Sequence, residues 1–223
     1  MNDVELTAEA LRLYRRYAVE IVEAFALCPW AERARRDGQV TERVLCQRGQ
    51  DTGPALSSVL ELARSPRIEV GLLIFPRLAV DALTFEHFTA KLRDQDAERH
   101  ELGAIPFAMA AFHPDADADL SDAERLIPFL RRTPDPTIQL VRRSVLDRVR
   151  GKSPQGTSFA DLDALEALEA TATGAAAGDQ ATLRERIARK NHETVRAAGV
   201  AALRARLDDI GRDRAASYAR LGA

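Results

Sequence analysis

The sequence predicts an α/β fold: a mostly parallel sheet of about four strands with flanking helices, an N-terminal helix and a helical C-terminal extension. Three observations lead to this prediction. Strand-like and helix-like segments alternate along residues 40–146, two strand-like segments are apolar on both faces, and the segments at both ends of the chain have helical spacing of apolar residues. Strands covered by helices on both faces are typical of parallel crossover units.

Composition narrows the class of protein. The 223 residues are 46% hydrophobic and 30% charged, which allows a buried core and is not typical of disorder. A net charge of −2 excludes a chain-wide basic surface for nucleic acid, and 5% aromatic residues are few for base stacking. The polar N-terminus, the lack of a long apolar run and only two cysteines lead us to expect a cytoplasmic protein without a membrane partner.

The N-terminal helix is predicted over residues 7–27, with Thr7 as its cap. A proline disfavours the α conformation of the residue before it, so Pro29 predicts that the helix ends near Leu27. Cys28 then lies on a bend rather than in a regular element. The apolar stripe of this helix comprises Leu11, Tyr14, Ala18, Ile21, Val22 and Phe25.

The central elements are predicted in the order strand 40–46, helix 52–65, strand 68–75, helix 82–102, strand 105–114, helix 121–132 and strand 137–146. The segments 68–75 and 105–114 are apolar throughout, which predicts interior strands. Residues 137–146 alternate between polar and apolar, which favours an edge strand.

Two regions are predicted: an α/β domain over residues 1–150, and a loop, linker and C-terminal helices packed on it over residues 151–223. The linker at 170–182 is rich in small residues, and one or two helices are expected from residue 183 onward. There, apolar residues recur at roughly helical spacing: Leu183, Ile187, Val195, Ala198, Leu203 and Leu207. Basic residues outnumber acidic ones in this last segment, so it could also dock a partner.

Two familiar motifs are incomplete. Gly151-Lys152-Ser153 lacks the glycine that a phosphate-binding P-loop has five positions earlier. The acidic run Asp115–Asp119 lacks the glycine and glutamate of a calcium loop. Cys28 and Cys46 have no zinc-type spacing, and no metal site is predicted.

The predicted binding residues are His113 and the arginines Arg131, Arg132 and Arg142. His113 follows an interior strand, where open α/β sheets place ligand crevices, and its imidazole can titrate near neutrality. Arg131 and Arg132 precede a turn with two prolines, and a guanidinium held there can bind a carboxylate or phosphate through two hydrogen bonds. The structural alternatives are a histidine that caps its strand beside an acidic loop, and an Arg132 that pairs with Asp135 or with that acidic loop.

Cys28 is predicted to be a nucleophile or redox thiol, with His113 as its base or general acid. A thiol of pKa about 8.5 needs a neighbouring cation to react at neutral pH. A helix C-terminus opposes this activation because its partial charge is negative. The alternative is a packed, inert thiol enclosed by apolar groups such as Phe25 and Trp30.

Four short motifs together resemble a bacterial family of domain-of-unknown-function proteins: Cys28-Pro29-Trp30-Ala31, Phe112-His113-Pro114-Asp115, Arg132-Thr133-Pro134-Asp135-Pro136 and Arg142. The resemblance covers roughly residues 10 to 150 and implies that Cys28, His113, Arg132 and Arg142 occupy the family's characteristic positions. It differs from the family pattern at Trp30, Ala111, Arg131 and Asp135. The resemblance implies no established activity.

These features predict a positively charged pocket for a small anionic molecule, formed by Cys28, His113, Arg132 and Arg142, with Arg131 nearby. One function is an enzyme acting on a small carboxylate or phosphate. The alternative is a non-catalytic ligand-binding or accessory protein. The sequence does not decide between them, and it leaves the oligomeric state and any cofactor open.

Overall fold

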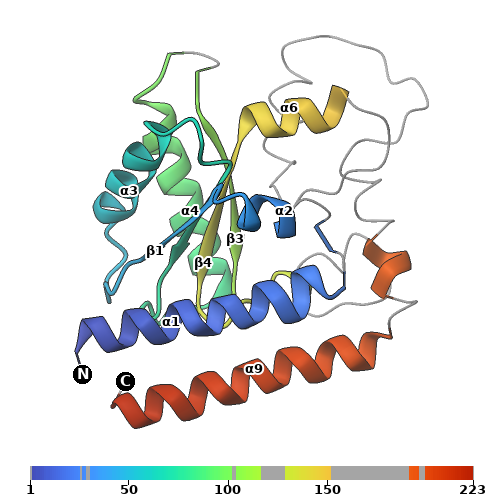
Figure 1. Ribbon diagram of the computed structural model, residues 1–223. Helices are drawn as coiled ribbons and strands as arrows, with labels where there is room; N and C mark the ends of the chain where they lie inside the picture. Colours follow the sequence, from blue (N-terminus) through green and yellow to red (C-terminus); the bar gives the residue numbers. More distant parts are fainter. Residues whose placement is uncertain are drawn as a thin grey trace.

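A mixed four-stranded sheet in the order β1-β2-β4-β3 lies at the centre of the fold (Figure 1). Its strands are β1 (Val40–Val44), β2 (Val70–Ile74), β3 (Phe107–Phe112) and β4 (Thr137–Arg142). β1 and β2 are parallel, whereas β4 runs antiparallel to both β2 and β3. The structure is a computed structural model and describes residues 2–25, 27–28, 31–101, 104–116, 129–151, 191–195 and 199–222.

The prediction of a mostly parallel sheet is wrong, because β4 inserts between β2 and β3 in the opposite direction. β4 was expected at an edge and is interior, and β3 was expected inside and is an edge strand. Apolar residues on both faces of a strand indicate that helices cover both faces. They do not indicate which way the strand runs or which strands lie beside it. β4 also ends at Arg142, and the expected strand residues 143–146 begin helix α6 (Arg143–Gly151).

Helices cover both faces of the sheet (Figure 1). α3 (Gly53–Ala63) and α4 (Ala82–Ala97) share one apolar cluster with alternate strand residues such as Leu73 and Met109. α1 (Asp3–Tyr17), η1 (Ala18–Glu23) and α9 (Val200–Leu221) share the other cluster, with Leu72 and Phe112. Alternate side chains of one strand point to opposite faces, so the sheet separates two layers of helices.

The helix termini differ from the prediction in their capping residues. α1 begins after Asn2, whose side chain accepts a hydrogen bond from the Val4 N–H at 3.0 Å, and not at Thr7. At the start of α3 the Thr52 hydroxyl donates to Gln95 at 2.6 Å and does not cap the helix. Asp81 caps α4 by accepting from the Thr84 N–H at 2.7 Å. α4 ends at Ala97, before the expected residue 102.

α1 continues into η1, a π-helical segment, so the N-terminal helix ends earlier than Leu27. A short helix, α2 (Ala31–Arg36), follows and packs against η1. Pro29 and Trp30 lie outside the described residues. So do most of the expected helix 121–132, the loop after Gly151, the linker 170–182 and much of the expected C-terminal helix before Val200.

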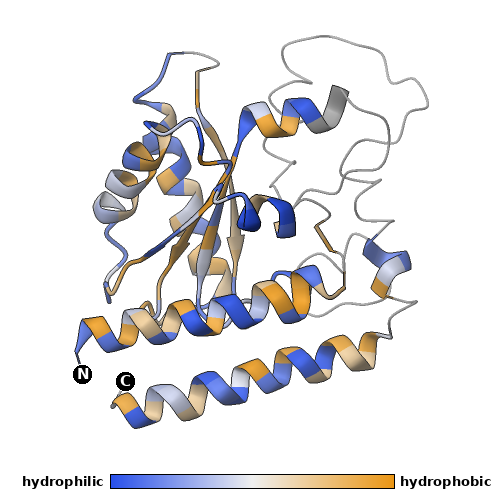
Figure 2. Cartoon of the chain, in the orientation of Figure 1, coloured by the Kyte–Doolittle hydropathy of each residue, from blue (hydrophilic) through white to orange (hydrophobic). Residues whose placement is uncertain are grey.

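α9 lies antiparallel beside α1, and both chain termini are at the same end of this pair (Figure 1). Hydrophilic and hydrophobic residues alternate along both helices, as in amphipathic helices (Figure 2). Leu203, Leu207 and Ile210 of α9 are buried in the cluster shared with α1. α9 runs to Leu221, where Gly222 adopts a left-handed conformation with φ of 70°.

None of the helices in the described part of the chain is long and apolar enough to cross a lipid bilayer.

Candidate functional site

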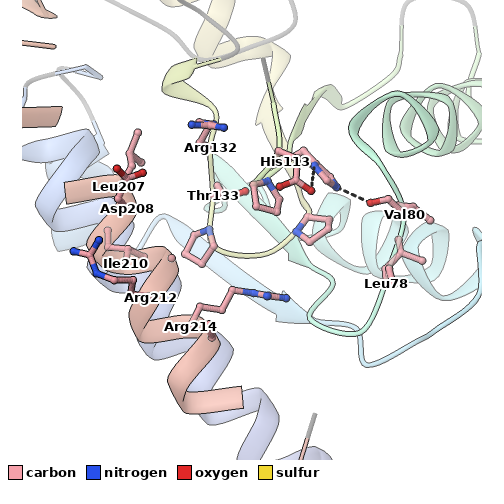
Figure 3. A pocket seen from close by; sticks show the side chains of 17 residues that line it. Leu78, Val80, His113, Arg132, Thr133, Leu207, Asp208, Ile210, Arg212 and Arg214 are labelled. Atoms are coloured by element: carbon pink, nitrogen blue, oxygen red, sulfur yellow. Dashed lines mark hydrogen bonds and ion pairs between the residues drawn. The ribbon is translucent and has the colours of Figure 1, made fainter. Parts of the chain in front are cut away.

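A pocket of about 620 Å³ lies at the edge of the sheet where β2 and β3 end and β4 begins (Figure 3). Three loops and one helix form its walls. The loops contribute residues 78–80 after β2, residues 113–115 after β3, and residues 132–134 and 136 before β4. α9 forms the facing wall with residues that include Leu207, Ile210 and Arg214. The carboxyl ends of strands are the usual place for ligand crevices in open α/β sheets.

The loop before β4 is tied to α9 by a buried carboxylate. Asp135, 1% exposed, accepts hydrogen bonds from Arg214 Nε and from the Tyr218 hydroxyl, both at 2.7 Å. Its carbonyl also accepts from the Thr133 hydroxyl at 2.7 Å. Burial raises the pKa of the Asp135 carboxyl, and the adjacent Arg214 opposes that rise. These contacts hold the loop in one conformation.

Arg132 lines the pocket from this rigid loop. Its guanidinium carbon lies 6.0 Å from the centre of the Phe129 ring. Its Nε is shielded from solvent and has no hydrogen-bond acceptor within the described part of the chain. An ion pair between Arg132 and Asp135 is not formed, because Asp135 pairs with Arg214 instead. The other structural alternative, pairing of Arg132 with the acidic loop, falls mostly on residues 117–128, which lie outside the described residues.

His113 also lines the pocket, but both of its ring nitrogens are engaged. Nε2 lies 3.0 Å from the Val80 carbonyl, which can only accept, so Nε2 carries the proton. Nδ1 accepts from the backbone N–H of Asp115 at 3.1 Å. Burial lowers the pKa of His113, so the imidazole is neutral at pH 7. In this arrangement the ring joins two loops of the pocket wall and has no free nitrogen to act as a base.

Arg142 lies at the opposite end of the sheet. β4 begins at the pocket and ends at Arg142, whose guanidinium donates to the carbonyls of Ile68 at 2.7 Å and Ser65 at 2.8 Å. Arg131 is nearer the pocket but lies over the Phe112 ring, 5.5 Å from its centre, and is not among the residues that line the pocket. The structure therefore places one of the three expected arginines, Arg132, in the site.

Cys28 lines a separate cavity of about 60 Å³ under α1 and η1, together with Tyr14, Glu42 and Gln139. It is 7% exposed and belongs to the apolar cluster on that face of the sheet. The His113 ring packs on the other face, 5.9 Å from the Phe85 ring of α4.

The expected convergence of Cys28 and His113 with Arg132 and Arg142 is therefore not found. Cys28 is on the opposite face of the sheet from the His113 ring. Arg142 is at the opposite end of β4 from the pocket. The burial of Cys28 favours a packed thiol. Within the described residues, no three His, Cys, Asp or Glu side chains are grouped so that they could hold a metal ion.

Residues 10–161 match the family described as Protein of unknown function (DUF1415). The chain belongs to this family. The expectation of a family of unknown function is thus confirmed, and the family description assigns no activity. No curated protein and no solved structure matches the chain.

The DUF1415 region contains the sheet and three of the four pocket walls, including His113 and Arg132. The fourth wall, α9, lies beyond the matched residues. Sequence reasoning missed Arg212, Arg214 and Ile210 of α9 as pocket residues. The only signal was the apolar spacing of Leu203 and Leu207, which predicts a packed helix but not the surface on which it packs.

Proposed function

We propose that this protein binds a small organic anion, a carboxylate or a phosphate, in the pocket between the sheet edge and α9, with Arg132 holding the anionic group. The observation that carries the proposal is that Arg132 lines the pocket without a carboxylate partner among the described residues. Its guanidinium lines the pocket, and its shielded Nε has no acceptor among the described residues. No carboxylate of the described residues neutralises this guanidinium, so an anionic ligand could pair with it.

The surroundings of Arg132 suit this role. A planar guanidinium binds a carboxylate or phosphate through two parallel hydrogen bonds. The loop that carries it is held by Asp135, Arg214 and Tyr218, so little conformational freedom is lost on binding. The pocket volume of about 620 Å³ is within the usual range for small-molecule sites.

The geometry supports binding more than a Cys–His reaction. The Cys28 thiol and the His113 ring lie on opposite faces of the sheet, and both ring nitrogens of His113 are hydrogen bonded. Docking of a partner on the apolar stripe of α9 has less support, because Leu203, Leu207 and Ile210 are buried in the chain's own core.

Replacement of Arg132 by glutamine tests the proposal. The probes are hexanoate and inorganic phosphate, and affinity is measured by isothermal titration calorimetry. We expect Arg132→Gln to weaken binding of the better probe by roughly 10-fold to 150-fold, the equivalent of losing about 1.5–3 kcal/mol of hydrogen bonding to a charged group.

The matched control is Arg67→Gln, which removes an exposed arginine just before β2, at the far edge of the sheet. It should leave affinity unchanged. Failure of both probes to bind, or equal affinities for the wild type and Arg132→Gln, would contradict the proposed function. Thermal unfolding of each variant shows that a loss of binding is not a loss of fold.

A further inference from the structure

We infer that the ligand of this pocket is a monocarboxylate with an apolar body rather than a phosphate or phosphate ester. The inference rests on the proposed function and narrows it to one class of ligand. Two independent features support it: the balance of charge around Arg132 and the apolar character of the walls.

The cationic groups in the pocket are largely neutralised. Arg214 is paired with the buried carboxylate of Asp135 at 2.7 Å, and Arg212 contacts Asp209 at 3.3 Å. Arg132 has no carboxylate partner among the described residues. Asp209 also binds Arg16, so it offsets Arg212 only in part, and Arg132 is the one pocket arginine without a carboxylate contact in the described part of the chain.

Two carboxylates also face the pocket. Asp115 and Asp208 line it and are exposed, and neither is paired with an arginine or lysine of the described chain. A phosphate monoester carries about −1.5 to −2 charges at pH 7, so these two carboxylates would repel it more strongly than they repel a carboxylate with a single charge. A carboxylate carries a single charge that Arg132 can neutralise.

Much of the remaining wall is apolar. Its members come from the three loops and from α9: Leu78, Ala79, Pro114, Pro134, Pro136, Leu207, Ile210 and Ala215 (Figure 3). An inorganic ion would leave most of a pocket of about 620 Å³ unfilled. An apolar body would instead cover the apolar surface that is still open in the pocket, chiefly at Ala79, Pro114 and Ala215, and each buried methylene increases affinity by up to roughly fourfold.

A chain-length series tests the inference on the full chain. Acetate, butyrate and hexanoate, together with hexyl phosphate, are titrated calorimetrically at about pH 7.5, where the phosphate monoester is mostly dianionic. We expect affinity to rise at least about twofold per methylene from acetate to hexanoate. We also expect hexanoate to bind more tightly than hexyl phosphate. The exposed variant Asp208→Asn should improve hexyl phosphate binding more than hexanoate binding.

The outcomes separate the two proposals. Equal or tighter binding of hexyl phosphate, equal affinities across the carboxylate series, or an Asp208→Asn variant that does not favour hexyl phosphate would overturn the monocarboxylate inference. The proposed function would survive each of these results, provided that Arg132→Gln still weakens binding. If none of these compounds binds, or if Arg132→Gln binds them as well as the wild type, the proposed function itself fails.

Discussion

The guanidinium of Arg142 joins the end of α3 to the start of β2. It donates to the carbonyls of Leu62, Ser65 and Ile68 at 3.3, 2.8 and 2.7 Å, and its carbon lies 4.6 Å from the centre of the Phe107 ring. The last carbonyls of a helix lack partners within the helix, so a cation there satisfies acceptors and favours the helix dipole. Arg142 is thus a structural residue in this fold.

Replacing Arg142 by glutamine should lower the free energy of unfolding by about 1.5–3 kcal/mol, because hydrogen bonds from a charged donor to partly buried carbonyls are lost. Urea denaturation measures the change. Hexanoate affinity should be unaffected, since Arg142 lies at the opposite edge of the sheet from the pocket. If the variant has unchanged stability but reduced hexanoate affinity, Arg142 contributes to binding and not to the fold.

Cys28 and Cys46 provide an internal comparison for thiol reactivity. Cys28 is buried in the cluster under α1, whereas Cys46 is partly exposed, with its sulfur 3.7 Å from the Thr7 hydroxyl. Because alkylation requires an accessible thiolate, iodoacetamide should modify Cys46 faster than Cys28 in the folded protein. Mass spectrometry after timed labelling measures both rates, and labelling in urea should remove the difference. If iodoacetamide modifies Cys28 faster than Cys46 in the folded protein, Cys28 is a reactive thiol.

At the scale of elements, a network of ion pairs joins α1 to α9. Arg12 pairs with Asp213 at 2.8 Å, and Arg16 pairs with Asp213 at 2.6 Å and with Asp209 at 2.9 Å. The hydrogen bond from Arg12 is the largest cause that lowers the pKa of Asp213, and Arg16 adds to it. The network fixes α9 in place along α1, and the same helix forms one wall of the pocket.

The α1–α9 network should make stability depend on pH in the acid range. A carboxyl whose pKa is lowered by folding stabilises the folded state above its unfolded pKa of about 3.9, and this contribution is lost as the pH falls through the folded value. At pH 7, Asp213→Asn should be less stable than the wild type by about 1 kcal/mol, and the difference should shrink below about pH 4. Thermal unfolding between about pH 2 and 7 measures it.

The control for this pH dependence is Asp37→Asn, which changes an exposed aspartate after α2. Its difference from the wild type should be small at every pH. A stability difference for Asp213→Asn that stays constant from neutral to acid pH would mean that the ion pairs of this network do not stabilise the fold.

For the whole molecule, the sequence predicted which segments are strands and helices better than how they are arranged. Apolar runs and helical spacing are local features, so β2, α4 and β3 were placed within about five residues of their observed bounds. The direction of β4 and its insertion between β2 and β3 depend on pairing between distant segments, and no local pattern encodes that. The polar Gln139 suggested an edge, although its side chain lines the small cavity under α1.

The candidate site was predicted in part for the same reason. A histidine directly after a strand and an arginine before a two-proline turn are expected where strands end and begin, and His113 and Arg132 line one pocket there. Arg142 was grouped with them because the direction of β4 was not known. The fourth wall was missed because α9 packs against the sheet edge through Asp135, Arg214 and Tyr218, a contact between residues far apart in the chain.

The central claim is that Arg132 and α9 enclose an anionic ligand, and a crystal structure of the full protein with hexanoate tests it most directly. We expect the carboxylate to bind the Arg132 guanidinium and the alkyl chain to lie along α9 beside Ala215. A structure in which hexanoate is bound elsewhere, or in which Arg132 is paired with a carboxylate of the protein and the pocket is closed, would contradict the account.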